Sequence, residues 1–263
     1  MPPALTAKPE RILSIDVLRG VTILAMIFVN DLADVGQGVE DLPSWLHHHF
    51  PYDADGMTWV DVIFPAFLYI VGIAIPFALG RRLEKGASAL SAWRHVVLRT
   101  LGLLAIGVFM VNGYTVAEDG ILPGPLWTLL MYTGVIAAWL SVPTEEGKKR
   151  NAIKTIKTIK ISGVALLVLL VFLYRGNDAE GLIRMRTHWW GILGLIGWAY
   201  LVAATIYLLL RKRVELIALA IPLLYALYLA DKAGGLSALR IIDRRVDIGP
   251  MLGSHAAMTL AGV

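Results

Sequence analysis

Long apolar runs separated by short polar segments recur along the whole of this 263-residue chain. Seven of the runs reach the length that an α-helix needs to cross a bilayer. They cover residues 12–32, 58–80, 95–112, 124–142, 159–175, 189–210 and 214–230. A transmembrane β-barrel would show segments of alternating hydrophobicity instead. The pattern therefore predicts an all-α fold, a polytopic transmembrane helical bundle.

A further apolar run starts near Gly253 and is cut off at Val263, after eleven residues. Eleven residues are too few to cross a bilayer. We therefore expect about 7 complete spans plus a truncated eighth, in a single transmembrane domain over residues 1–263. Such a chain is a fragment, or a short form that lacks later C-terminal helices.

The first run carries polar side chains at a depth where they are costly. At about 100° per residue, Asp16, Arg19 and Asn30 fall on one face of a helix. Asp16 and Asn30 lie about 21 Å apart along the axis, at about 1.5 Å per residue. Polar groups in membrane helices usually face protein or a water-filled cavity. We therefore expect this face to look into a protein interior.

The second run shows a comparable face, made of polar, glycine, proline and tyrosine positions. Its members are Thr58, Asp61, Pro65, Tyr69, Gly72 and Pro76. Because the first helix leaves the membrane where the second re-enters it, Asn30 and Asp61 are expected near the same outer end. The loop between the two helices contains His47, His48 and His49.

Composition and charge fix the class and the expected orientation. Hydrophobic residues make up 57% of the chain, and the mean hydropathy is +0.67, values typical of membrane proteins. Residues 1–19, 81–99, 148–160 and 211–213 hold 3, 5, 6 and 3 of the 24 Lys and Arg residues. The positive-inside rule then places the N-terminus in the cytoplasm. The expected location of the chain is the inner cell membrane.

Several chemistries are disfavoured by the sequence. The net charge of +4 comes from short basic clusters between apolar runs, which are topology signals, so no nucleic-acid partner is expected. The chain has no cysteine, which excludes disulfides and thiolate ligands. The histidine triplet lacks the spacing of a convincing metal site, so no metal is expected.

A family resemblance is carried by Ser14-Ile-Asp16-Val-Leu-Arg19-Gly20, Phe28-Val-Asn30, a loop histidine, Gly56-Met-Thr58, Asp61 and Phe64-Pro65-Ala-Phe67. The pattern resembles the N-terminal portion of the heparan-alpha-glucosaminide N-acetyltransferase family, in its bacterial branch, over roughly residues 11–80. The resemblance implies a multi-pass acyltransferase. It would move acetyl from cytosolic acetyl-CoA, as co-substrate, to an amino sugar or other glycan on the extracytoplasmic side. By matching positions, the family's loop histidine corresponds to His49 and its helix asparagine to Asn30, with His47 and His48 as alternatives.

The chemistry of acyl transfer is compatible with these assignments. An amine must lose a proton as it attacks a thioester, so a neutral imidazole, His49, suits the general base. The amide of Asn30 suits the oxyanion donor, and Asp61 would orient the histidine. Direct transfer is preferred over an acetyl-histidine intermediate, because one positioned base suffices. Helix capping by Asp61 and helix contacts by Asn30 are the alternative, structural interpretations.

Acetyl-CoA carries phosphates, which call for cations at the cytoplasmic face. The candidates are Arg19, with Asp16 beside it, and Arg94 and Arg99 at the start of the third helix. Arg81 and Arg82, at the end of the second helix, lie at the same face. Two further interpretations stay open. Asp16 and Arg19 would also form a structural ion pair, and Arg94 and Arg99 would also serve as topology signals.

Two other function classes remain. A transporter or flippase for a sugar or lipid-linked intermediate would use the same polar face, with Pro65 and Pro76 marking a broken helix. A non-catalytic membrane scaffold would need no acetyl-CoA. The expected surroundings are membrane lipids, and a homodimer is compatible with the sequence.

Overall fold

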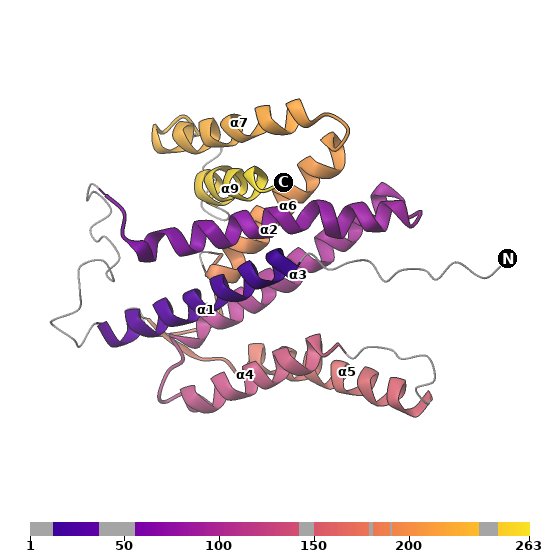
Figure 1. Ribbon diagram of the computed structural model, residues 1–263. Coiled ribbons are helices and arrows are strands. Elements are labelled where there is room, and N and C mark those ends of the chain that lie inside the picture. The colour runs from indigo at the N-terminus through magenta and orange to yellow at the C-terminus, as the bar shows by residue number, and fades with distance from the viewer. Residues whose placement is uncertain (1–12, 37–55, 142–149, 179–180, 190, 237–246) are drawn as a thin grey trace. The chain divides into compact units, whose positions relative to one another are not determined.

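The computed structural model describes residues 13–36, 56–141, 150–178, 181–189, 191–236 and 247–263. Over these residues the chain is helical apart from one short hairpin (Figure 1). In chain order the elements are α1 (Leu13–Gly36), α2 (Trp59–Glu84), α3 (Ala89–Gly113), α4 (Gly124–Trp139), α5 (Arg150–Leu173), β1 (Gly176–Asp178), β2 (Gly181–Ile183), α6 (Ile192–Leu210), α7 (Val214–Lys232), η3 (Gly249–Ser254) and α9 (His255–Ala261).

Within the described residues, six helices are long and apolar enough to span a membrane: α1, α2, α3, α5, α6 and α7. The chain is therefore a polytopic helical membrane protein, as the apolar runs predict. The fourth run differs, because α4 has 16 residues. That length is about 24 Å at about 1.5 Å per residue, which is less than the usual span of about 20 residues.

Packing divides the chain into two compact units. The first consists of residues 1–100 and 198–263, and the second of residues 101–197. The boundaries fall inside α3 and α6, so each of these helices contributes one part to each unit.

In the first unit, α1 packs against α2 through the half that holds Val29. This side chain lies in one cluster with Val60 and Ile63 at the start of α2. Thr22 is buried on the same side of α1, whereas Asp16 and Asn30 are exposed. The expectation that the polar face of α1 looks into a protein interior is therefore not met at Asn30, whereas Asp16 and Arg19 border a cavity against α2 and α3. The face of α1 that packs against protein contains Thr22 and Val29.

The predicted face of α2 packs against the C-terminal segment. A Cβ atom on Gly72 would overlap the carbonyl oxygen of Thr259 in α9, and one on Gly262 would overlap that of Tyr69. The two backbones thus approach so closely that neither glycine leaves room for a side chain. The prediction that this face of α2 is turned away from lipid is confirmed at Gly72, whereas the Tyr69 side chain of the same face is exposed.

The core of the first unit joins five helices. Its buried members are Ile75, Leu79, Val96, Tyr200, Ala203, Ala204, Ile217 and Leu260. They come from α2, α3, α6, α7 and α9. This core fixes the ends of α2 and α6 relative to each other.

In the second unit, α4 and α5 form an antiparallel pair. Trp127 near the start of α4 donates its indole N–H to the carbonyl of Leu170 near the end of α5, at 3.2 Å. Farther along α4, Gly134 faces Leu167. Gly163 in turn packs against Ala137. Small residues therefore let the two helices approach closely.

The loops at one end of this unit are tied together. Asn112, buried at the end of α3, donates its side-chain amide to the carbonyls of Val108 and Arg186, at 2.7 and 2.8 Å. Its side-chain oxygen accepts the Arg186 N–H at 3.0 Å. The hairpin of β1 and β2 adds an isolated bridge between Gly176 and Val116. The α3–α4 and α5–α6 connections therefore lie at the same end of the unit, and the sequence pattern did not predict the hairpin.

Candidate functional site

A cavity of about 540 Å³ opens in the first unit, between α1, α2 and the start of α3. This volume falls within the usual range of small-molecule sites. Its lining combines apolar residues with three arginines and one aspartate: Ile15, Asp16, Arg19, Ala74, Phe77, Ala78, Arg81 and Arg99. Three of the four residues predicted to bind acetyl-CoA, Asp16, Arg19 and Arg99, are thus brought together.

The one carboxylate of this cavity is only weakly engaged. A guanidinium nitrogen of Arg19 lies 3.9 Å from a carboxylate oxygen of Asp16, and the two side chains are 43% and 47% exposed. An ion pair of this length and exposure contributes little to stability. Arg19 therefore keeps hydrogen-bonding capacity for an anion that enters the cavity.

Arg99 is oriented by an aromatic ring. Its guanidinium carbon lies 5.4 Å from the ring centroid of Tyr200 in α6, within the range of a cation–π interaction. The N–H donors of the guanidinium can still bind an anion, because a cation–π interaction does not use them. Tyr200 itself is buried in the core of the unit. No local sequence pattern connects these two residues, which are far apart along the chain.

Arg81 is the third lining arginine, one of the two cations that the sequence places at the end of the second helix. Ala74, Ala78 and Arg81 follow one another at helical spacing on the side of α2 opposite Asp61 and Gly72. The small side chains of the two alanines make room for the cavity, and Arg81 adds a cation to its lining.

Arg94, the fourth predicted ligand of acetyl-CoA, does not line this cavity. It is exposed on α3, five residues before Arg99. Five residues correspond to about 500° of rotation, so the two side chains leave the helix in different directions.

The predicted catalytic residues belong to the other end of α2. Asp61 accepts hydrogen bonds from the backbone N–H of Thr58, at 2.9 Å, and from its hydroxyl, at 3.1 Å. These bonds close the start of α2, so helix capping is a role that the structure shows for Asp61. Val29 packs beside Val60, which brings the neighbours Asn30 and Asp61 to the same level. His47, His48 and His49 lie outside the described residues.

The two groups of predicted site residues are far apart. Asp61 and Arg81 are separated by twenty residues of α2, or about 30 Å at about 1.5 Å per residue. This distance equals the hydrocarbon thickness of a typical bilayer, about 30 Å. The cationic cavity and the capped end of α2 therefore lie at opposite ends of a helix that is long enough to span a membrane.

Pro65 and Pro76 do not break α2. Both lie inside a helix that is continuous from Trp59 to Glu84, since neighbouring helices can satisfy the carbonyls that a proline leaves without a partner. The broken helix expected of a transporter site is thus absent from this part of the chain.

The fold and the cavity define a polytopic helical membrane protein with an arginine-lined site at one end of its first two helices. The chain belongs to the family described as a domain of unknown function (DUF5009), whose model matches residues 11–243. The family description does not name an activity.

Two relatives with a named activity are similar to part of the chain. Heparan-alpha-glucosaminide N-acetyltransferase of Homo sapiens is 32% identical over 108 residues, which are 41% of this chain and 15% of that protein. The enzyme of Mus musculus is 32% identical over 103 residues, 39% of this chain and 14% of that protein. The similarity thus covers a small part of both relatives, and the relationship is distant. No solved structure matches the chain.

Proposed function

We propose that the chain is part of a transmembrane acyltransferase that takes acetyl from cytosolic acetyl-CoA and delivers it to an amino sugar or other glycan across the membrane. The cavity lined by Arg19, Arg81 and Arg99 is the observation that carries the proposal. Three arginines against one aspartate give a local excess of positive charge, which suits the phosphates of coenzyme A. The named activity of the distant relatives supports the same choice of donor.

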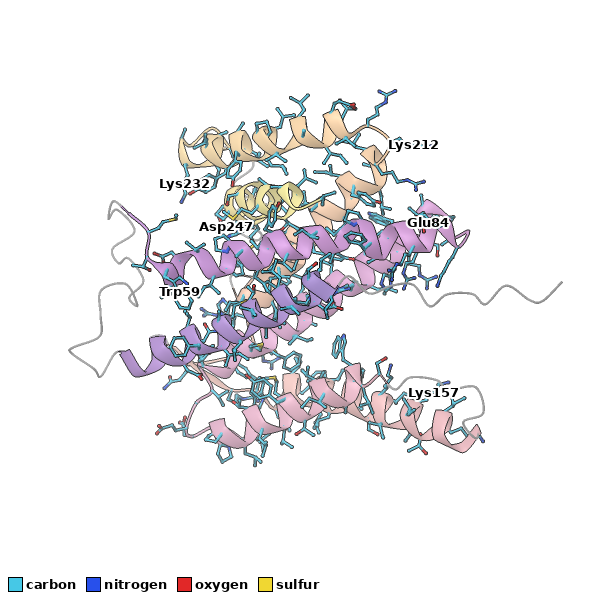
Figure 2. The ribbon with its side chains drawn as sticks, in the orientation of Figure 1. Trp59, Glu84, Lys157, Lys212, Lys232 and Asp247 are labelled. Carbon is cyan, nitrogen blue, oxygen red and sulfur yellow. The ribbon has the colours of Figure 1, made fainter. Side chains whose placement is uncertain are left out.

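The proposed orientation places this cavity on the cytoplasmic side. Figure 2 shows Glu84 and Lys212 at one end of the first unit, and Trp59, Lys232 and Asp247 at the other. The first of these ends holds the basic segments 81–99 and 211–213, which the positive-inside rule assigns to the cytoplasm. Donor binding would then occur where acetyl-CoA is present.

The pairing of α4 with α5 supports seven crossings despite the short α4. The α3–α4 and α5–α6 connections lie at the same end of the second unit, because Asn112 and Val116 bond to Arg186 and Gly176. If α3 and α5 both cross toward that end, the chain must return between them. We assign this return to α4.

The proposed chemistry acts at the opposite end of α2. His49 would serve as general base, Asn30 as oxyanion donor, and Asp61 as the residue that positions the histidine. Direct attack of the acceptor amine on the thioester forms the amide and releases the coenzyme A thiol. Because about 30 Å separates the two ends of α2, the thioester arm of a donor held by Arg19 and Arg99 must extend into the bundle.

Acetyl-CoA binding by the purified chain tests this proposal. Isothermal titration should show saturable binding of acetyl-CoA, and weaker binding of the dephosphorylated analogue that lacks the ribose phosphate. The loss of one charge-assisted contact predicts a weakening of about tenfold or more. A chain that binds neither compound, while retaining its thermal unfolding transition, would contradict donor binding.

A further inference from the structure

A second cavity lies in the first unit, at the end that carries Glu84 and Lys212 (Figure 2). Its volume is about 430 Å³. It opens between two turns, the one that links α2 to α3 and the one that links α6 to α7. Its lining residues are Gly80, Leu83, Glu84, Ala87, Ala89, Tyr207, Arg211 and Lys212. None of them lines the arginine cavity beside α1.

The walls of this second cavity are held in place by the core and by one polar contact. Trp93, one turn into α3, donates its indole N–H to the hydroxyl of Thr205 in α6, at 3.3 Å. Below the cavity, Leu79 and Ala204 are buried in the common core. The cavity is therefore built into the packing of α2, α3 and α6.

The polar groups of this cavity suit a phosphate ester that carries a hydrogen-bond donor at the end away from the phosphate. Within the described part of the chain, Arg211 and Lys212 form no ion pair, although Glu84 shares the cavity with them. The Tyr207 hydroxyl adds a donor, since it lies 3.5 Å from where a Cβ atom on Gly80 would stand. Two cations and a hydroxyl suit a phosphate, and the Glu84 carboxylate suits an ammonium or hydroxyl group.

The cavity also has apolar surface directly beside it. Leu90 follows the lining residue Ala89 and is 73% exposed, and Leu209 lies two residues before Arg211 and is 76% exposed. Both stand in helices long and apolar enough to span a membrane, so these exposed side chains are available to acyl chains. Trp93 and Tyr207 are the aromatic residues expected at the membrane interface.

We propose that this cavity binds the headgroup of a phospholipid. The phosphate would lie between Arg211 and Lys212, and the outer hydroxyl or ammonium group would donate to Glu84. This chemistry fits phosphatidylglycerol and phosphatidylethanolamine. It excludes phosphatidylcholine, whose quaternary ammonium has no N–H to donate. The proposal is independent of acetyl-CoA, which is assigned to the other cavity.

Lipid binding to the purified chain, measured by native mass spectrometry with each of the three phospholipids, tests the proposal. The wild-type chain should bind phosphatidylglycerol and phosphatidylethanolamine at least fivefold more tightly than phosphatidylcholine. Replacing both cations, Arg211→Gln with Lys212→Gln, should lower the affinity for the two preferred lipids at least tenfold. Arg213→Gln is the matched control, because Arg213 carries the same charge in the same turn but does not line the cavity.

Two variants at one glycine separate the cavity from general surface charge. Gly80→Ala should retain binding, since its Cβ meets the Tyr207 hydroxyl at an ordinary contact distance, whereas Gly80→Leu should fill the cavity and abolish the preference. Equal losses in Arg213→Gln and in the double variant would overturn the proposal. Displacement of the lipid by inorganic phosphate at equal concentration would also overturn the proposal, because the cavity would then bind a soluble anion as well as it binds the lipid.

Discussion

Arg99 is the side chain whose setting departs most from that of an ordinary topology residue. Arginines near the ends of membrane helices commonly reach into water, whereas Arg99 stands over the ring of Tyr200 and lines a cavity with Arg19 and Arg81. The cation–π interaction with Tyr200 restricts the positions that the guanidinium occupies beside the cavity. In the proposed function, this restriction favours binding of an anion by Arg99.

Replacing Arg99 with alanine should weaken acetyl-CoA binding about tenfold or more. The reason is the loss of one charge-assisted hydrogen bond to phosphate, worth about 1.5–3 kcal/mol. Isothermal titration of the purified variant gives the affinity. Arg94→Ala is the matched control, since Arg94 lies on the same helix outside the cavity. Equal losses in the two variants would assign the effect to overall charge rather than to the cavity.

Substitution at His49 should separate binding from chemistry. His49→Ala is expected to bind acetyl-CoA normally but to lose acetyl transfer to an amino sugar, because the general base acts only on the acceptor. Asn30→Ala should lower turnover about a hundredfold, the usual effect of one oxyanion donor. The assay follows acetylated amino sugar, with His47→Ala and His48→Ala as controls for the register of the loop. Full activity in all three histidine variants would rule out a histidine base.

At the scale of helices, the contact between α2 and α9 depends on glycine. Gly72→Val should lower the melting temperature of the purified chain by several degrees, because even a Cβ at this position overlaps the carbonyl of Thr259. Tryptophan fluorescence during heating measures this shift. Gly20→Ala is the control, since nothing lies within 4 Å of the Cβ position there. If Gly72→Val melts at the wild-type temperature, the close packing of the two helices is wrong.

The helical features that could be predicted are those that depend on the local pattern of apolar and polar residues. The apolar runs identified the spans, and the stripe through Gly72 identified the face of α2 that packs against protein. The face of α1 was misjudged at Asn30, because the polarity of this side chain was taken as evidence of burial. Thr22 and Val29, which carry little polar signal, are the residues that pack.

Features that depend on distant parts of the chain could not be predicted. The hairpin at Gly176 exists because its backbone pairs with Val116, and no local propensity indicates a strand in that segment. Likewise, Tyr200 comes to lie beside Arg99 through the packing of α3 against α6 in the first unit. The histidines of the first outer loop remain a prediction from the sequence.

For the molecule as a whole, the proposed topology places Ser88 in the cytoplasm and Tyr114 outside. A chain without cysteine allows single cysteines to be introduced at these two exposed positions. In intact cells, an impermeant thiol reagent should label Tyr114→Cys, because the α3–α4 connection lies outside. Ser88→Cys should react only after permeabilisation. The reverse pattern would invert the membrane orientation and place the arginine cavity on the wrong side for cytosolic acetyl-CoA.

The hydrogen bonds of Asn112 also bear on the chemical lifetime of the chain. Asn112 precedes Gly113, and an asparagine before glycine readily loses its side-chain ammonia when the next backbone nitrogen attacks it. In the folded second unit that attack is blocked, because Asn112 is helical and its amide is bonded to Val108 and Arg186. Conversion to aspartate would remove both donated bonds. The rate at which the acidic product accumulates at Asn112 therefore reports how often the end of α3 unfolds locally.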